Sequence, residues 1–402
     1  MTPDAAITPG EEAVLLAVVV AFAWNLGAHY TGATMGMAYA SRSVALWPAL
    51  GMVALFALLG ATFASGRVEQ TVGLHLVAER QVRRFGRPEP LDRPGNVGLH
   101  LVAERQVRPL TAIVIVASGG ALTMLFNSLR LPTSTIQILV FCVIGAATAA
   151  GLTVHWATLA ELAMVWAAAP LAACVLGFLL TRALDRVVPP EAAAEQARRQ
   201  LGGPAGRGAP PSRLAAWFPG VALGLPARLE ERARAERPRH PGLAVAALRL
   251  LPPLLVAVGV FASFVMGGND VANATGALLL VHLFSTRPAG AIGGAAMFAG
   301  ALLWGRRILE RVAFDVVRLD LAMASAAQGV QALVVVLAVG QGLFTSMNQA
   351  LVAAMAGTGL ARGRHTVRRD QLLAILAGWL IGPAAGFILA YLGQRVAQLA
   401  GG

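Results

Sequence analysis

Charged residues are scarce in this chain. Asp, Glu, Lys and Arg together account for 13% of its 402 residues, whereas 57% are hydrophobic, and the mean hydropathy is +0.67. This composition excludes an ordinary soluble protein and indicates an integral membrane protein. Because a span needs about 20 apolar residues, the sequence predicts about ten membrane segments. They fall near residues 12–40, 44–65, 109–129, 133–155, 158–181, 246–266, 271–285, 288–305, 321–343, 345–361 and 371–393.

Lysine is absent, and all 32 basic residues are arginine. A base-composition bias that also enriches Ala, Gly and Pro explains this better than a chemistry that requires arginine. The net charge of +12 could indicate a nucleic-acid partner. However, the arginines are confined to loops, where the positive-inside rule places them on the cytoplasmic side of a membrane. Nucleic-acid binding is therefore not expected.

Cysteine is rare, and the common catalytic motifs are missing. Cys142 and Cys174 both lie in apolar blocks, where free buried thiols are expected rather than a disulfide. The sequence contains neither HExxH nor GxSxG, which argues against an enzyme and indicates no cofactor. The amino terminus lacks a basic region and a cleavage site, so the first apolar block is expected to stay as a membrane segment.

A long Arg- and Pro-rich stretch divides the chain. Residues 182–245 contain eleven arginines and no long apolar run. This pattern predicts a cytoplasmic linker between a first membrane half, residues 1–181, and a second membrane half, residues 246–402.

The two halves resemble each other at two places. "GAHYTGATMG" (27–36) shares its bounding glycines with "GGNDVANATG" (267–276). "LPTSTIQ" (131–137) shares Leu, Thr, Ser and Gln with "LFTSMNQ" (343–349). Two matches in the same order indicate an internal duplication.

The first half carries an insertion between its two motifs. Its motifs are 105 residues apart, against 77 in the second half, a difference of 28. The dodecamer "VGLHLVAERQVR" also occurs twice there, at 72–83 and 97–108. We infer that the loop 66–108 gained an inserted segment that is not part of the functional machinery. The alternative is a pair of amphipathic helices at the membrane surface.

The loops constrain the topology. If the 66–108 loop and the linker are both cytoplasmic, an even number of crossings separates them, yet three apolar blocks lie between. One block would then be re-entrant or broken. The stretch 131–151 opens with proline and hydroxyl residues and is the candidate.

A polar cluster interrupts the second half. Asn269, Asp270 and Asn273 would be costly in hydrocarbon unless something compensates them. Gly267 and Gly268 are expected to break the helix, and a helix that resumes at Asn269 would bring the three side chains to one side. Carboxylate, amide and freed carbonyl oxygens suit Na⁺, whereas the N-terminus of a half-helix suits an oxyanion. A broken helix near the bilayer midplane could provide both.

Hydroxyl residues recur at matched positions. Thr133, Ser134 and Thr135 open one apolar block, and Thr345 and Ser346 open its counterpart. Hydroxyls together with backbone N–H groups can bind a tetrahedral oxyanion without a buried arginine. Capping or packing of helices is the ordinary role of such residues, but the duplication favours binding.

The first-half motif is chemically different. Asn25 and His29 are its candidate counterparts to the polar cluster, and His29 is either a packed residue or a proton carrier. Tyr30 stands where the second copy has Asp270. Further polar residues in apolar surroundings have no spacing that ranks them: Gln328, Gln331 and Asn348.

These motifs resemble the inorganic phosphate transporter (Pit) family. Its duplicated signature is close to G-[AG]-N-D-x-A-N-A-x-G, followed in each half by P-x-S-[ST]. "GGNDVANATG" is a nearly complete match and "LPTSTIQ" matches the second element. "LFTSMNQ" loses the proline, and "GAHYTGATMG" keeps only the glycine frame. The resemblance covers both membrane halves but not the linker or the insertion.

The resemblance implies an all-α polytopic membrane protein whose homologous halves form an inverted repeat with broken or re-entrant helices. It implies a secondary transporter that binds an oxyanion between the halves and is driven by Na⁺ or H⁺. Carried onto this chain, the coupling-ion ligands are Asn269, Asp270 and Asn273, with Asp270 the candidate Na⁺ ligand. The substrate ligands are Thr133, Ser134, Thr345, Ser346, Asn269 and Asn273. The missing Asn-Asp pair in the first half argues against a symmetric cation site.

Inorganic phosphate is the expected substrate. Sulfate is the alternative, because a bacterial branch of the family that carries sulfate also has a degenerate first signature. An anion channel is a weaker alternative, since it needs rings of ligands that two halves supply poorly. The expected location is the bacterial cytoplasmic membrane, crossed several times, and faces rich in Ala and Gly would permit a homodimer.

Overall fold

The computed structural model describes residues 7–65, 108–189, 216–218, 231, 241–281, 283–317, 319–340 and 345–400. Within these ranges the chain is helical, and the pairing of Val317 with Val367 is an isolated bridge rather than a sheet. The longer helices are α1 (Pro9–His29), α2 (Thr31–Ala40), α3 (Leu46–Phe63), α5 (Pro109–Ser128), α6 (Thr135–Ala149), α7 (Trp156–Leu184), α12 (Pro241–Leu280), α13 (Thr286–Trp304), α14 (Arg306–Phe314), α15 (Leu321–Gly340), α16 (Met347–Arg362) and α17 (Arg369–Ala400). The insertion and most of the linker lie outside the described residues.

The helices confirm the prediction of an all-α polytopic membrane protein. In the described part of the chain, seven helices are long and apolar enough to cross a membrane, or eight if α13 and α14, which meet at 64°, count as one span. The outer helices α7 and α17 expose large apolar side chains, such as Leu171 at 69% and Leu380 at 78%. Such surfaces face hydrocarbon in a membrane protein.

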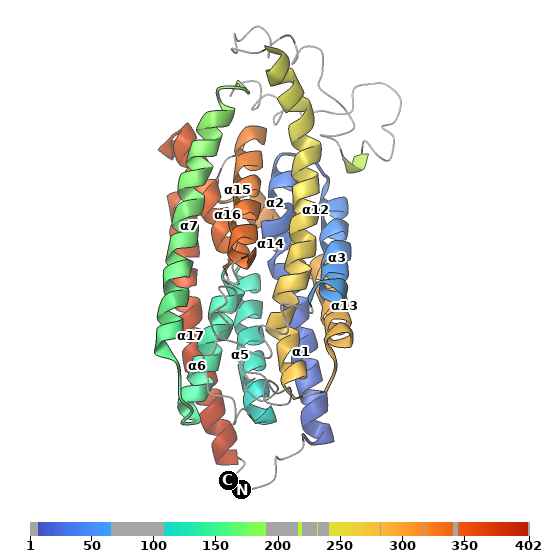
Figure 1. Ribbon diagram of the computed structural model, residues 1–402, viewed down its shortest axis with the longest axis vertical. Coiled ribbons are helices and arrows are strands. Elements are labelled where there is room, and N and C mark those ends of the chain that lie inside the picture. Colours follow the sequence, from blue (N-terminus) through green and yellow to red (C-terminus); the bar gives the residue numbers. More distant parts are fainter. Residues whose placement is uncertain are drawn as a thin grey trace, which may run out of the picture.

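Two short hairpins enter the bundle from opposite ends. In Figure 1, α5 and α6 occupy the lower half of the molecule, whereas α15 and α16 occupy the upper half. The 15 residues of α6 measure about 22 Å at 1.5 Å per residue, less than the roughly 30 Å of a hydrocarbon core. The stretch 131–151, expected to be re-entrant, therefore forms the short returning arm of a hairpin.

The described helices bear on the topology. The hairpin of α5 and α6 begins and ends at one end of the molecule, and α7 runs from that end to the other (Figure 1). By length and composition α5 is itself one of the candidate spans, so the side of the membrane on which each loop lies stays a prediction.

Glycine contacts join the helix of each signature motif to a helix of the other half. A Cβ atom at Gly27 of α1 would collide with the carbonyl of Met297 in α13. A Cβ atom at Gly300 of α13 would in turn collide with the carbonyl of Trp24 in α1. The two helices can approach this closely only because both positions are glycine.

The same reciprocal contact joins α12 to α3. Gly267 of α12 lies against the carbonyl of Ala57, and Gly60 of α3 lies against the carbonyl of Phe264. Each of these residues is related to its counterpart in the α1–α13 contact by a constant shift of 240 residues. Reciprocal contacts of this kind arise from two-fold symmetry, so they support an inverted repeat.

In the hairpins the contacting glycines are related by a shift of 212 residues, and their carbonyl partners by a shift of 213. Gly145 of α6 packs against the carbonyl of Phe387 in α17, and Gly357 of α16 packs against the carbonyl of Cys174 in α7. The change of shift from 240 to 212 equals the 28 extra residues between the first-half motifs. The extra residues therefore fall between α3 and α5, where the sequence predicted an insertion.

Helix contacts divide the molecule into three groups. We call α1, α2, α3, α12, α13 and α14 the motif bundle. The other two groups are α5 with α6 and α17, and α15 with α16 and α7, and we call these two groups together the hairpin bundle. The two bundles meet mainly where α1 packs on α5 and where α12 packs on α15, which are equivalent pairs under the repeat. The residues singled out in the sequence lie along this boundary.

An ion cluster holds one hairpin to the long helix α7. The Nη2 atom of Arg362, at the end of α16, lies 2.7 Å from Oδ1 of Asp185 and 3.1 Å from Oδ2 of Asp320. Burial raises the pKa of both carboxyl groups, and the charge of Arg362 opposes that shift. The repeat places Ala150 opposite Arg362, so this cluster has no counterpart in the first hairpin.

Replacing Arg362 with methionine is expected to destabilise the protein by about 3 kcal/mol, because the buried carboxylate of Asp320 and the half-buried carboxylate of Asp185 lose their cation. Since the folded state raises both pKa values above the ordinary value of about 3.9, it holds these protons more tightly than the unfolded state. Stability therefore falls as the pH rises above about 4, and more steeply without the arginine. Unfolding temperatures in detergent at pH 5 and pH 8 test this. An equal drop at both pH values would contradict it.

Candidate functional site

The glycine pair before the polar cluster does not break the helix. α12 is continuous from Pro241 to Leu280, so the expectation of a break at Gly267 and Gly268 is wrong. The two glycines serve close packing instead. Gly267 lies on the Ala57 carbonyl, and a Cβ atom at Gly268 would lie 2.9 Å from the Cβ of Ala64. Because the two glycines have no side chains, α3 can pack closely against α12, and α12 stays helical.

The three polar side chains still share one side of α12. Asp270 and Asn273 are buried, with 4% and 5% of their surface exposed, and Asn269 is half-buried. Their spacing of three and four residues on a continuous helix produces this convergence. The three side chains therefore lie together as predicted, but an uninterrupted helix, rather than a helix break, brings them together.

The first-half motif contains a one-residue interruption. Tyr30 separates α1 from α2, although the two helices continue as one candidate span, Pro9–Ala40. The Tyr30 hydroxyl lies 2.6 Å from the Oγ1 of Thr135 at the start of α6. The same hydroxyl lies beside the carboxylate of Asp270 and interacts with it. The Oδ2 atom of Asp270 is buried and has no hydrogen-bond partner among the described residues. Tyr30 thus links Asp270, the equivalent residue of the second half, to the hairpin bundle. One carboxylate oxygen of Asp270 stays available to a ligand.

His29 is a packed residue with both nitrogens engaged. Its Nδ1 lies 2.6 Å from Oδ1 of Asn127, and the amide of Asn127 is oriented by a 3.0 Å hydrogen bond from its Nδ2 to the carbonyl of Asn25. Nδ1 of neutral His29 must therefore donate, and Nε2 accepts from the backbone N–H of Thr133 at 3.2 Å. His29 fixes the non-helical segment before α6.

Asn25 itself binds within its own helix. Its Nδ2 donates to the carbonyl of Ala21 at 2.8 Å, and its Oδ1 is buried with no hydrogen-bond partner in the part of the chain that the structure describes. This side chain therefore keeps one acceptor available at the first-half motif.

The two duplicated serines cap the short helices. The Oγ of Ser134 accepts from the backbone N–H of Gln137, and the Oγ of Ser346 accepts from that of Gln349, both at 3.4 Å. Capping is thus one role of these residues, as their type suggests. An accepting hydroxyl can still donate its own hydrogen, and the remaining first-turn N–H groups face the N-terminal end of each helix, where an anion is favoured. Thr345 is buried directly before Ser346.

A reciprocal amide pair joins the tips of the two hairpins. Nε2 of Gln137 donates to Oε1 of Gln349 at 3.1 Å, and Nε2 of Gln349 donates to Oε1 of Gln137 at 2.9 Å. These residues are equivalent in the repeat, so the pair is what a two-fold axis between α6 and α16 would produce. Their shared position in "LPTSTIQ" and "LFTSMNQ" was the signal that could have identified them.

Asn348 connects the second hairpin to the first. Its Nδ2 donates to the carbonyl of Thr133 at 3.0 Å, while its Oδ1 is buried without a hydrogen-bond partner in the described ranges. Sequence spacing could not rank this residue. Because it is the second residue of α16, it reaches across the tips to the carbonyl of Thr133.

The structure therefore brings most of the expected residues to one boundary. Thr133, Ser134 and Ser346 gather where the hairpin tips meet, and Asp270 joins them through Tyr30 and Thr135. Asn269 and Asn273 lie beside Asp270 on α12. Helix N-termini and hydroxyls on one side, with a carboxylate and amides on the other, can hold an anion and a cation near each other.

The chain is similar to known transport proteins. A model of the phosphate transporter family matches residues 26–390. An inorganic phosphate transporter of the Arabidopsis thaliana chloroplast is 36% identical over 143 residues, which are 32% of this chain and 24% of that protein. A putative phosphate permease of Chlamydia pneumoniae is 31% identical over 36% of each chain. The match spans well under two thirds of either relative.

One relative aligns over most of its length. The sulfate permease CysP of Bacillus subtilis is 22% identical over 92% of this chain and 84% of its own. A solved structure titled the sodium-dependent phosphate transporter superposes with a TM-score of 0.69 and covers 97% of this chain and 99% of its own. At 19% identity, that similarity establishes the fold.

Proposed function

Because the chain belongs to the phosphate transporter family, we propose that it carries inorganic phosphate across the cytoplasmic membrane in symport with Na⁺ or H⁺. The meeting of two helix N-termini at a boundary that also holds one buried carboxylate carries this proposal. The family is one of transporters rather than enzymes, and we propose no cofactor.

The anion would bind at the hairpin tips. The N-termini of α6 and α16, tied together by the amides of Gln137 and Gln349, would supply backbone N–H groups, with donors from Ser134, Ser346 and the two threonines. Neutral donors of this kind hold an oxyanion without the cost of burying arginine.

The cation would bind at Asp270. Its unpaired Oδ2 and the amide oxygens of Asn269 and Asn273 provide the hard oxygen ligands that Na⁺ requires. His29 would position the hairpin rather than carry protons, because both of its nitrogens are engaged. A single carboxylate would favour one cation at this end of the site.

Alternating access would follow from the two bundles. Substrate and cation ligands come from different bundles, so motion of the hairpin bundle against the motif bundle would open the site to either side. We place residues 1–181 and 246–402 as the two membrane halves and the 182–245 linker on the cytoplasmic side. The segment before α5 would then be external. A homodimer remains part of the proposal and rests on the Ala- and Gly-rich faces.

Sulfate is the second candidate substrate. The alignment with the sulfate permease CysP, over 92% of this chain, is the observation that favours it. Saturable radiotracer uptake in a strain that lacks its own phosphate and sulfate permeases tests both candidates. Uptake of phosphate that depends on Na⁺ or on a proton gradient would support the proposal. Flux without saturation would indicate a channel and overturn it.

The serines at the hairpin tips give a sharper test of the anion site. We expect Ser346→Ala to raise the KM for the anion about tenfold, because a donor to the substrate is lost. The maximal rate should change little. Ser325→Ala is the control, since its hydroxyl bonds only its own helix, at the carbonyl of Leu321. Loss of rate without a change of KM would show that Ser346 serves only as a cap.

A further inference from the structure

Gln328 and Gln331 in α15 form a buried amide pair whose polar atoms are only half used. Both side chains are fully buried. Nε2 of Gln328 donates to the carbonyl of Ala33 in α2 at 3.2 Å and to Oε1 of Gln331 at 2.8 Å. Oε1 of Gln328 and Nε2 of Gln331 have no hydrogen-bond partner among the residues described.

The orientation of both amides is fixed by these contacts. Turning over the Gln328 amide would set its oxygen against the carbonyl of Ala33, and turning over the Gln331 amide would set two NH₂ groups together. The unpaired atoms are therefore one acceptor and one donor with two hydrogens. Buried groups of this kind are normally paired, so they indicate a polar ligand.

The pair is hydrogen-bonded to α2 one helical turn beyond Tyr30. Ala33 follows Tyr30 by three residues, about 4.5 Å along the helix axis, and Tyr30 contacts both Asp270 and Thr135. The shift of 212 residues places Val116 and Gly119 opposite the two glutamines. The amide pair is therefore a feature of the second half alone, as is Asp270.

We propose that Gln328 and Gln331 form a subsite that selects a protonated tetrahedral oxyanion, such as phosphate or arsenate, over sulfate. This inference rests on the proposed transport function. Nε2 of Gln331 donates to an oxygen of the anion, and Oε1 of Gln328 accepts from its hydroxyl. Phosphate and arsenate keep at least one hydroxyl at neutral pH, whereas sulfate has none. Sulfate would leave the buried acceptor unpaired, and a site built for a hydroxyl discriminates strongly against a ligand that lacks one.

A cation is a poorer occupant of this subsite. It needs several oxygen ligands, and the pair offers one unpaired amide oxygen next to an amide donor that repels a cation. In the part of the chain that the structure describes, no three His, Cys, Asp or Glu residues gather to hold a metal ion. The combination of acceptor and donor fits an anion that carries a proton.

Competition during uptake of radiolabelled phosphate tests the proposal. In the wild type, unlabelled arsenate should inhibit uptake at concentrations similar to those of phosphate, and sulfate should need at least about 100-fold more. Gln331→Glu keeps the oxygen that accepts from Gln328 but replaces the free donor, so the KM for phosphate should rise about tenfold or more. Gln328→Met should narrow the gap between phosphate and sulfate. Gln394→Met is the control, since Gln394 is also buried with an unpaired Oε1 but lies on α17 outside the site.

The outcomes separate this inference from the function on which it rests. Sulfate that competes as well as phosphate would overturn the subsite and leave oxyanion transport intact. Unchanged KM and selectivity in both variants would show that the pair holds only water. If the wild type takes up neither anion, the transport proposal fails, and binding of inorganic phosphate to the purified protein then tests the subsite directly. Equal binding to wild type and Gln331→Glu would overturn it.

Discussion

Replacing Asp270 with asparagine is expected to abolish concentrative uptake of the anion while leaving the protein folded. Asparagine has nearly the same shape and volume as aspartate, so packing around the site should persist. The substitution removes the one carboxylate among the site residues, whose Oδ2 is unpaired. Without that charge a bound cation would lose its strongest ligand.

The size of this effect follows from the coupling between cation and anion. If each ion strengthens binding of the other, loss of the cation site removes the whole coupling free energy, about 100-fold in anion affinity at the upper end of the usual range. Uptake against a gradient should fall to background, whereas exchange of labelled for unlabelled anion down a gradient should persist. Measuring both fluxes in proteoliposomes distinguishes a lost driving ion from a lost substrate site.

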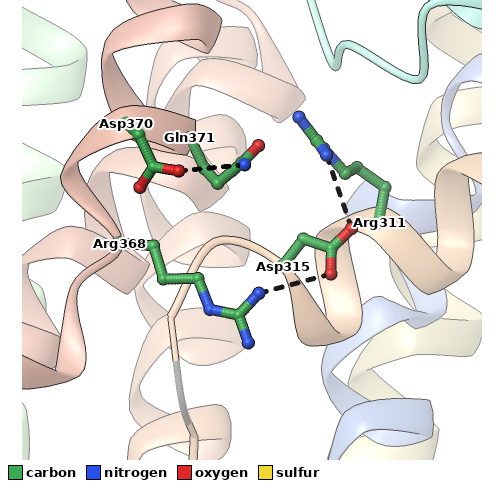
Figure 2. Close-up of polar contacts among 5 residues, drawn as sticks. All are labelled: Arg311, Asp315, Arg368, Asp370 and Gln371. Atoms are coloured by element: carbon green, nitrogen blue, oxygen red, sulfur yellow. Dashed lines mark hydrogen bonds and ion pairs between the residues drawn. The ribbon is translucent and has the colours of Figure 1, made fainter.

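Asp370→Asn provides the matched control. Figure 2 shows Asp370 beside Gln371, in the same region as Asp315, Arg311 and Arg368. Its carboxylate is exposed and accepts a 3.2 Å hydrogen bond from Gln371, so its loss should leave uptake unchanged. Concentrative uptake by Asp270→Asn at the wild-type level would remove Asp270 from the coupling mechanism. Loss of the folded protein would mean that the carboxylate is structural, and Asp270→Glu would then show whether charge restores transport.

More of the fold than of the candidate site could be predicted from the sequence. Apolar blocks predicted the helices because hydrocarbon thickness and backbone hydrogen bonding leave few other solutions. The paired motifs and their spacing also predict an insertion in the 66–108 loop, since a duplicated chain keeps a constant shift until residues are added; this stays a prediction. The sequence could not distinguish which apolar blocks pair as a short hairpin, because a hairpin and a full span look alike in composition.

The helix break expected at Gly267 and Gly268 is absent for a physical reason. Two adjacent glycines permit either a break or a close approach by another helix, and only the position of α3 decides between these. In the first half, α1 ends just before Tyr30, although Gly27, three residues earlier, is packed against Met297 of α13. The hydrogen-bond partners of the polar residues could not be predicted from the sequence either. Gln137 and Gln349 are 212 residues apart in the chain, and nothing local shows that their amides meet.

The reciprocal glycine contacts should be more sensitive to substitution than any polar residue. Gly60→Val and Gly300→Val each place a branched side chain on a backbone carbonyl of the other half, at Phe264 and Trp24 respectively. A carbonyl inside a helix cannot move aside without loss of its hydrogen bond, so the helices must separate. Overpacking commonly costs about 1–3 kcal/mol, and more where backbone is displaced.

The repeat also predicts how the two variants compare with each other. Because Gly60 and Gly300 are equivalent, both variants should lose the monodisperse peak in detergent chromatography to a similar degree. Gly51→Val in the same helix as Gly60 is the control, since nothing lies within 4 Å of a Cβ atom at Gly51. It carries the same change of helix propensity without the collision. If Gly51→Val were as damaging as Gly60→Val, propensity rather than contact between the halves would be the cause. If Gly60→Val alone were damaging, the two interfaces would not be equivalent, and the two-fold relation between the halves would fail at the contact that best supports it.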